Sequence, residues 1–270
     1  MGQGRIAIMS NAGGTGKTTL AANIAYQLAR LGKSVCLVGC DPNGSLALFV
    51  GLEDPADKVE TLDKVLDPSF NGEWPLFPVW RDKVNSVDAI LGGLHLFETT
   101  KRLDQDPRGA YLLSDALEDH PLTHDYLLFD CPGTVERYHE VALCGCTHIL
   151  VTLRPEYKDV DAGFKLINWI YDWQKRLRLK PAREILGVVI NGFDRNTAMH
   201  REIMGDDPDY SLPLALEGMG LALLKSLPFS RQLRNSSANG VPLGLWRPGD
   251  EINNQFREIA QRIVEEMKNA

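Results

Sequence analysis

The sequence predicts an α/β fold in which helices cover both faces of a mostly parallel, twisted sheet. Short, continuously apolar segments alternate with segments of helical spacing along the 270 residues, and continuously apolar strands are typical of parallel sheets buried on both faces. A glycine-rich turn also separates the first apolar segment from the first helical one. Ligands of such sheets bind at the carboxyl ends of the strands, so we expect the functional site there.

The composition fits one large domain, residues 1–270, because 44% of the residues are hydrophobic and can form a full core. The net charge of −7 means that DNA would be bound only through a local basic patch. The start of the chain has no signal-peptide pattern, and no apolar run approaches the roughly 20 residues of a membrane-spanning helix, so we expect a cytoplasmic protein. The odd number of cysteines, mostly in strand-like runs, indicates reduced core residues. These cysteines are Cys36, Cys40, Cys131, Cys144 and Cys146.

The N-terminal half of the chain predicts the first units of the sheet. A buried strand is expected over 5–10, a helix over 18–31 and a second buried strand over 34–38. The segment 50–120 is less regular. Prolines and glycines mark a loop in it, and only 110–117 has the pattern of a helix.

The C-terminal half continues the alternation of strands and helices. Strands are expected over 126–129, 148–153, 185–190 and 222–227, and helices over 160–177 and 250–268. The last helix has an apolar face that includes Phe256, Ile259 and Ile263. Four glutamates lie on its polar face, where anionic lipid would repel them. We therefore interpret this helix as docked on the core rather than as a membrane-targeting tail.

The turn after the first strand, 11–19, has the pattern of a phosphate-binding loop. Its glycines would let successive backbone N–H groups surround phosphate oxygens, and the start of the following helix would add its dipole. Lys17 would reach the β- and γ-phosphates, and the Thr18 hydroxyl would bind Mg²⁺. Asn11 stands where the strict pattern has glycine. The residues expected to bind the nucleotide here are Gly13, Gly14, Thr15, Gly16, Lys17, Thr18 and Thr19.

The run GGTGKTT at 13–19 resembles the deviant Walker A box of the ParA/MinD family of ATPases. Other segments resemble the motifs of this family in the same order along the chain. They are the switch segment 38–45, the Walker B segment 125–132, Pro155-Glu156-Tyr157, the segment 191–197 after the fifth expected strand, and the stretch 227–242. The resemblance therefore spans nearly the whole chain.

The resemblance implies an ATPase that binds ATP and Mg²⁺ and hydrolyses ATP to ADP and phosphate. Asp41 matches the aspartate that positions the attacking water, and Asp130 matches the Walker B aspartate that holds Mg²⁺. With Lys17, these two residues form the expected catalytic set, and Thr18 and Asp130 form the expected metal site. Asn191 is the expected adenine contact, and Pro228 and Phe229 would flank the base.

Two positions depart from the family pattern. Gly39 replaces the first aspartate of the switch segment, and Ala12 replaces the signature lysine that normally reaches the phosphates of the partner subunit. Proteins of the McdA subfamily, which distribute carboxysomes over the nucleoid, resemble ParA but lack that lysine. They are expected to supply a substitute lysine from a later segment. Lys158 is our candidate for this substitute, and Arg154 is the next.

The resemblance further implies a nucleoid-associated ATPase that forms a homodimer with ATP, binds DNA without sequence preference and positions cargo, with carboxysomes as the leading candidate. A small McdB-like or ParB-like adaptor would stimulate hydrolysis and release, and no membrane is expected to take part. Arg231 and Arg234 are the expected DNA contacts. The alternatives are a plasmid or chromosome partition ATPase and a metabolic P-loop enzyme, either a small-molecule kinase or a synthetase. Neither a membrane-bound regulator nor an iron–sulfur ATPase fits the acidic last helix and the cysteine positions.

Overall fold

The computed structural model describes residues 2–52, 60–84 and 86–269. One sheet runs through these residues, with eight strands in the order β3-β4-β2-β5-β1-β6-β7-β8. Among the described strand pairs only β3–β4 is antiparallel, which confirms the predicted mostly parallel sheet. The strands are β1 (Gly4–Met9), β2 (Val35–Gly39), β3 (Phe77–Pro78), β4 (Val87–Ile90), β5 (Tyr126–Asp130), β6 (His148–Leu153), β7 (Glu184–Phe193) and β8 (Leu223–Pro228).

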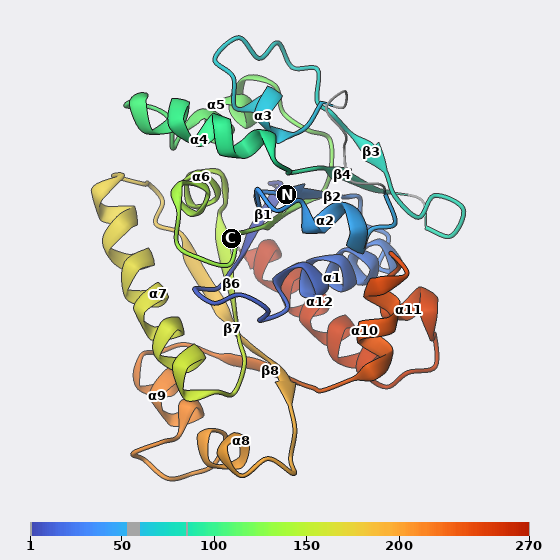
Figure 1. Ribbon diagram of the computed structural model, residues 1–270, viewed down its shortest axis with the longest axis vertical. Helices are drawn as coiled ribbons and strands as arrows, with labels where there is room; N and C mark the ends of the chain where they lie inside the picture. Colours follow the sequence, from blue (N-terminus) through green and yellow to red (C-terminus); the bar gives the residue numbers. More distant parts are fainter. Residues whose placement is uncertain (1, 53–59, 85, 270) are drawn as a thin grey trace.

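Helices cover both faces of the sheet, as Figure 1 shows. Their bounds are α1 (Lys17–Arg30), α2 (Ser45–Phe49), α3 (Leu62–Val65), α4 (His95–Gln105), α5 (Leu112–Asp119), α6 (Arg137–Gly145), α7 (Tyr157–Arg176), α8 (Ala198–Ile203), α9 (Leu212–Gly218), α10 (Arg231–Ala238), α11 (Leu243–Trp246) and α12 (Ile252–Asn269). Successive side chains of a strand point to opposite faces. In β1, Ala7 and Met9 therefore pack in the core that α4, α5, α6 and α7 share, whereas Ile6 and Ile8 pack in the core beneath α1, α10 and α12.

The last helix docks on the core, as predicted. Phe256, Ile259 and Ile263 of α12 are at most 1% exposed, and α12 packs along α1. No helix within the described ranges combines the length and the apolar character that crossing a membrane requires.

The five cysteines are buried and form no disulfide. Burial raises the pKa of the Cys144 and Cys146 thiols to about 12, so these groups stay protonated at neutral pH. This confirms the prediction that they are reduced core residues.

The irregular segment 50–120 contains more structure than its pattern predicts. Its described part holds the short strand β4 and the helix α4, neither of which the sequence predicts. The strand has only four residues, and Asp88 interrupts its apolar run. Asp88 instead pairs with His124 at 2.9 Å, between its Oδ2 and the ring Nε2, and this partner lies too far along the sequence for a local pattern to show it.

Candidate active site

The sheet order brings the predicted phosphate-binding and catalytic residues together. The strands β2, β5 and β1 are neighbours. Asp41 follows β2, Asp130 ends β5, and the glycine-rich loop follows β1. Parallel strands end at the same edge of a sheet, so these residues meet at one point. A cavity of about 440 Å³, here called the phosphate-side cavity, is lined by Asp41 together with Lys17 and Thr18.

The glycine-rich loop is held in place from the two strands on its other side. Gly14 and Gly16 have φ angles of 72° and 91°, in the left-handed region that favours glycine. The carbonyl of Thr15 accepts hydrogen bonds from the Asn191 amide at 2.9 Å and from the Thr152 hydroxyl at 3.2 Å. A Cβ atom on Gly16 would lie 2.0 Å from the Asn191 Nδ2 atom. Glycine is therefore required at position 16 for both its conformation and its space.

Lys17 is buried within the loop that it is expected to serve. Its Nζ donates a hydrogen bond to the Ala12 carbonyl at 3.1 Å. Burial lowers the pKa of Lys17, while the nearby Asp130 carboxylate opposes this shift. A neutral carbonyl is a weaker partner for an ammonium group than an anion, so a bound phosphate would displace it readily.

Asp130 has the properties of a cation ligand. It is 1% exposed, and neither carboxylate oxygen has a hydrogen-bond partner among the described residues. Burial raises the pKa of Asp130 to about 7, and the Thr18 hydroxyl and the Lys17 ammonium oppose this rise. An unpartnered buried carboxylate is costly, and Mg²⁺ prefers carboxylate, hydroxyl and phosphate oxygens. The residues Thr18 and Asp130 therefore fit the predicted magnesium site.

Asp41 is one of the residues that line the phosphate-side cavity. Its Oδ1 accepts two hydrogen bonds from Asn43, one from the backbone N–H and one from the side-chain amide, each at 2.9 Å. The carboxylate is thus oriented through Oδ1, and it is partly exposed to solvent. It is placed to accept a hydrogen bond from a water molecule in the cavity.

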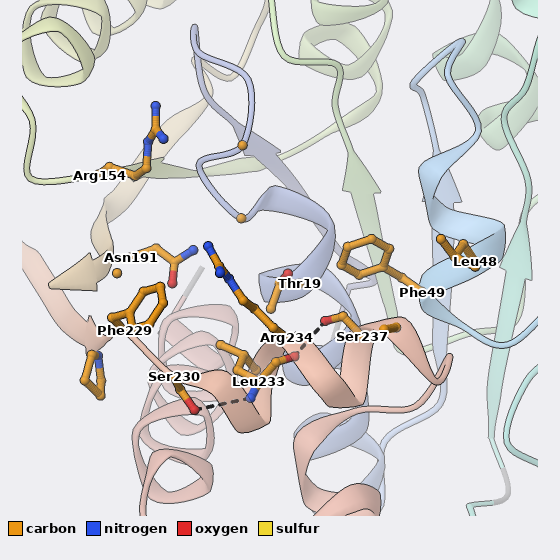
Figure 2. A pocket seen from close by; sticks show the side chains of 15 residues that line it. Thr19, Leu48, Phe49, Arg154, Asn191, Phe229, Ser230, Leu233, Arg234 and Ser237 are labelled. Atoms are coloured by element: carbon orange, nitrogen blue, oxygen red, sulfur yellow. Dashed lines mark hydrogen bonds between the residues drawn. The ribbon is translucent and has the colours of Figure 1, made fainter. Parts of the chain in front are cut away.

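A second cavity, of about 450 Å³, continues from the loop over the ends of β6, β7 and β8, and we call it the base-side cavity (Figure 2). The predicted base contacts Asn191, Pro228 and Phe229 all line it, together with Gly14, Gly16 and Thr19. The structure therefore joins the predicted base contacts to the predicted phosphate loop. Sequence reasoning missed Leu48 and Phe49 of α2, which form another wall, since no motif marks them.

The candidate substitutes for the signature lysine occupy different positions. The Lys158 side chain is 73% exposed, and its Nζ lies 3.7 Å from Glu156. It lines neither cavity. Arg154 does line the base-side cavity, where its Nε donates to the Asp159 carboxylate at 2.6 Å.

The predicted DNA contacts also separate. Arg231, the first residue of α10, is exposed and lines neither cavity. Arg234, one turn later, lines the base-side cavity.

Asn11 and Ala12, which both differ from the residues expected at the start of the loop, form hydrogen bonds in the structure. The Asn11 side-chain oxygen accepts a hydrogen bond from the backbone N–H of Val135 at 3.3 Å, so it ties the loop to the segment after β5. The Ala12 N–H donates to the Ser10 hydroxyl at 3.3 Å.

Gly39 is enclosed by a second glycine. A Cβ atom at position 39 would lie 2.8 Å from the backbone nitrogen of Gly92 and 3.2 Å from Leu46. In turn, a Cβ atom at position 92 would lie 2.7 Å from the Gly39 carbonyl oxygen. The aspartate of the family pattern therefore cannot be placed at position 39 unless the backbone moves.

The segment after Asp41 is packed against the helix that carries Arg234. A Cβ atom on Gly240, just after α10, would lie 2.2 Å from the Gly51 Cα, just after α2. The Trp80 indole N–H also donates to the Gly240 carbonyl at 3.0 Å. Backbone thus touches backbone where α2 meets the end of α10.

Comparison with known proteins identifies related sequences. Residues 4–182 match the AAA_31 family, described as an AAA domain. The chromosome partitioning protein ParA of Caulobacter vibrioides is 29% identical over 208 residues, which are 74% of this chain and 74% of that protein.

Solved structures share the whole fold. The apo McdA structure from Cyanothece has a TM-score of 0.80 at 18% identity, with 97% of this chain and 100% of that chain covered. Cobyrinic acid a,c-diamide synthase of Mycobacterium smegmatis, solved with bound ADP and magnesium, has a TM-score of 0.78 at 21% identity, with 99% of this chain and 96% of that chain covered. At these identities the two structures establish the fold and leave the activity to the site residues.

Proposed function

The chain belongs to the AAA domain family of the ParA/MinD type, and we propose that it is an ATPase whose ATP-bound form is a homodimer. The proposed reaction is hydrolysis of ATP to ADP and phosphate by a single P-loop domain that spans residues 1–270. One observation carries the proposal: the buried Asp130 carboxylate has no partner among the described residues and lies beside Thr18 and Lys17.

Four residues on the phosphate side of the site have a defined part in this reaction. Thr18 and Asp130 would hold Mg²⁺, which neutralises charge on the β- and γ-phosphates when it is bound. Lys17 exchanges the Ala12 carbonyl for phosphate oxygens and stabilises the charge that develops on them. Asp41 accepts a hydrogen bond from the attacking water and orients it toward the γ-phosphate.

The cellular role that we propose is positioning of cargo, most closely in the manner implied by the McdA resemblance, with carboxysomes as the cargo. The ATP-bound dimer binds nucleoid DNA without sequence preference, and an adaptor of the McdB or ParB kind stimulates hydrolysis and release. Arg231 is the proposed DNA contact whose position suits that role, because it is exposed and outside both cavities. Two copies in a dimer would double the basic surface and make DNA binding depend on ATP.

The replacement of the signature lysine by Ala12 requires another cation at the dimer interface. Lys158 remains our candidate, because its side chain at the start of α7 is 73% exposed and its ammonium group is held only by a long ion pair with Glu156, at 3.7 Å. Arg154 is the second candidate, but two carboxylates hold it, Asp159 at 2.6 Å and Glu156 at 3.6 Å.

Two other functions compete with this proposal. The similarity to ParA favours a partition ATPase that moves plasmids or chromosomes. The fold shared with a diamide synthase favours a metabolic P-loop enzyme that activates a small carboxylate.

The deciding experiment is light scattering after size exclusion, in Mg²⁺ with ATP and in Mg²⁺ with ADP, followed by binding to DNA of arbitrary sequence in the same two states. We expect a monomer with ADP and a DNA-binding dimer with ATP. Asp130→Asn is the control that should prevent the change. A monomer in both states without DNA binding would reject the positioning role and favour the metabolic enzyme.

A further inference from the structure

The two arginines of the base-side cavity differ in their partners. Arg154 is paired with Asp159 and Glu156. Arg234 has no carboxylate within 4.0 Å among the described residues, and no acidic side chain lines this cavity. Arg234 therefore brings an uncompensated positive charge to a cavity that also contains the glycines of the phosphate loop. Such a charge is suited to a ligand that supplies negative charge or an electron-rich ring.

The position of Arg234 is well defined by its surroundings. The Ser230 hydroxyl caps α10 by accepting a hydrogen bond from the Leu233 N–H at 3.2 Å, and the buried Leu233 anchors the same turn. In Figure 2 the Arg234 side chain extends from α10 toward Asn191 and the glycine-rich loop. Although Arg234 is exposed, its side chain lines the cavity, so a ligand held there would contact it.

The Arg234 guanidinium group is backed by an aromatic ring. Its Cζ lies 4.7 Å from the centre of the Phe229 ring, and the backbone N–H of Phe229 is fixed by the Phe193 carbonyl at 3.0 Å. A guanidinium group is planar and weakly hydrated, so it stacks on aromatic rings with either face. With Phe229 on one side, the other side can accept the flat ring of a purine base.

We propose that Arg234 binds the nucleotide at its base and ribose end, with Phe229 as support, and that it is not a DNA contact. This inference rests on the proposed function, because it assumes that the cavity holds a nucleotide. It assigns to Arg234 a role that its sequence position did not reveal. Since the contact lies away from the γ-phosphate, ADP and ATP should depend on it equally.

The test is calorimetric titration of ADP, and of a non-hydrolysable ATP analogue, into the full chain in excess Mg²⁺. Arg234→Ala should weaken the binding of both nucleotides by the same factor, about 3- to 30-fold. Arg234→Lys keeps the charge but loses the planar group, and it should recover only part of that loss. Arg257→Ala, which removes an exposed arginine of α12 outside the cavity, is the charge-matched control and should bind both nucleotides like the wild type.

DNA binding at saturating nucleotide completes the experiment. Arg234→Ala should bind DNA as the wild type does once it is loaded with nucleotide. Unchanged nucleotide affinity together with weaker DNA binding would overturn the inference and make Arg234 a DNA contact. A loss seen with the ATP analogue but not with ADP would also overturn it, in favour of a γ-phosphate contact. If the wild type itself binds neither nucleotide, the proposed function fails before this inference is reached.

Discussion

The phosphate side and the base side of the site are built in opposite ways. On the phosphate side two charged groups are buried, with Lys17 7% exposed and Asp130 1% exposed, while Asp41 is partly exposed. On the base side Phe229 is 51% exposed, and the neighbouring cationic residue Arg234 is also exposed. Buried charges are costly without partners, whereas exposed ones are solvated. In the nucleotide-free protein, the buried charges of the phosphate side therefore carry a desolvation cost that a bound ligand would reduce. The exposed residues of the base side carry little such cost and provide contact area for a ligand.

The strongest test of this contrast is Lys17→Ala. Removing the buried ammonium takes away charge stabilisation that water cannot replace, so we expect ATP turnover to fall by about 100-fold or more. The exposed Lys165→Ala of α7, whose partner is Asp161, is the control. Equal losses of nucleotide affinity in Lys17→Ala and Arg234→Ala would show that the two sides do not differ as described.

Asp130 should make the stability of the nucleotide-free protein depend on pH. Its pKa is about 7 in the folded state and roughly 4 when unfolded, so the folded protein binds the extra proton between these values. The free energy of unfolding should therefore fall as pH rises from 4 to 7, by at most about 1.4 kcal/mol per unit, and level off above 7.

Asp130→Asn, which cannot ionise, should lack this contribution. Urea unfolding of both proteins at several pH values without Mg²⁺ measures the difference between them. A difference that stays constant from pH 4 to 8 would mean that Asp130 is solvated or already paired, and the phosphate side would then resemble the base side.

A substitution at Gly39 would measure how tightly the end of β2 packs against Gly92. Gly39→Ala places a methyl group against the Gly92 backbone, so we expect a loss of about 1–3 kcal/mol in the free energy of unfolding. Gly218→Ala in α9 is the matched control, since nothing lies within 4 Å of its added Cβ, and it should be neutral or slightly stabilising. Chemical denaturation of the three proteins decides the matter. A stable Gly39→Ala would show that β2 and the loop after β4 can separate.

The smallest effect is expected from Lys158→Ala. Within the described part of the chain this exposed residue makes one ion pair, with Glu156 at 3.7 Å, so its removal should change folding stability by less than about 1 kcal/mol. It should nevertheless weaken ATP-dependent dimerisation measured by light scattering. A dimer of unchanged affinity would remove Lys158 from the mechanism and leave Arg154 to be tested in the same way.

The two sides also differ in how well the sequence predicted them. Lys17 and Thr18 lie within one continuous run, whose local pattern predicts a phosphate-binding loop, whereas Asp41 and Asp130 were predicted through the family resemblance. The base side is assembled from α2, β7, β8 and α10. Asn191, Pro228 and Phe229 were predicted through the family resemblance, whereas Phe49 lies in a short helix without a motif.

The sequence also could not predict that the Arg234 side chain lines the base-side cavity. Arg231 and Arg234 look equivalent as basic residues of one stretch, and both are exposed on neighbouring turns of α10. What separates them is the base-side cavity, which Arg234 lines and Arg231 does not. In the same way, the glycine at position 39 is an unexplained departure in the sequence. Its cause, the approach of Gly92, depends on the pairing of β2 with β4.

The contact between Gly51 and Gly240 makes the two sides mechanically dependent on each other. The backbone of Gly51, after α2, packs directly on the backbone of Gly240, after α10, so a displacement of one helix would press on the other at this point. A base that moved α10 would shift α2, and with it the chain that follows Asp41. By linkage, a ligand whose binding reorients Asp41 through α2 would change the affinity for the base, and the base would change the affinity for that ligand by the same factor. A bulkier residue at position 240 would therefore change nucleotide affinity and water positioning together.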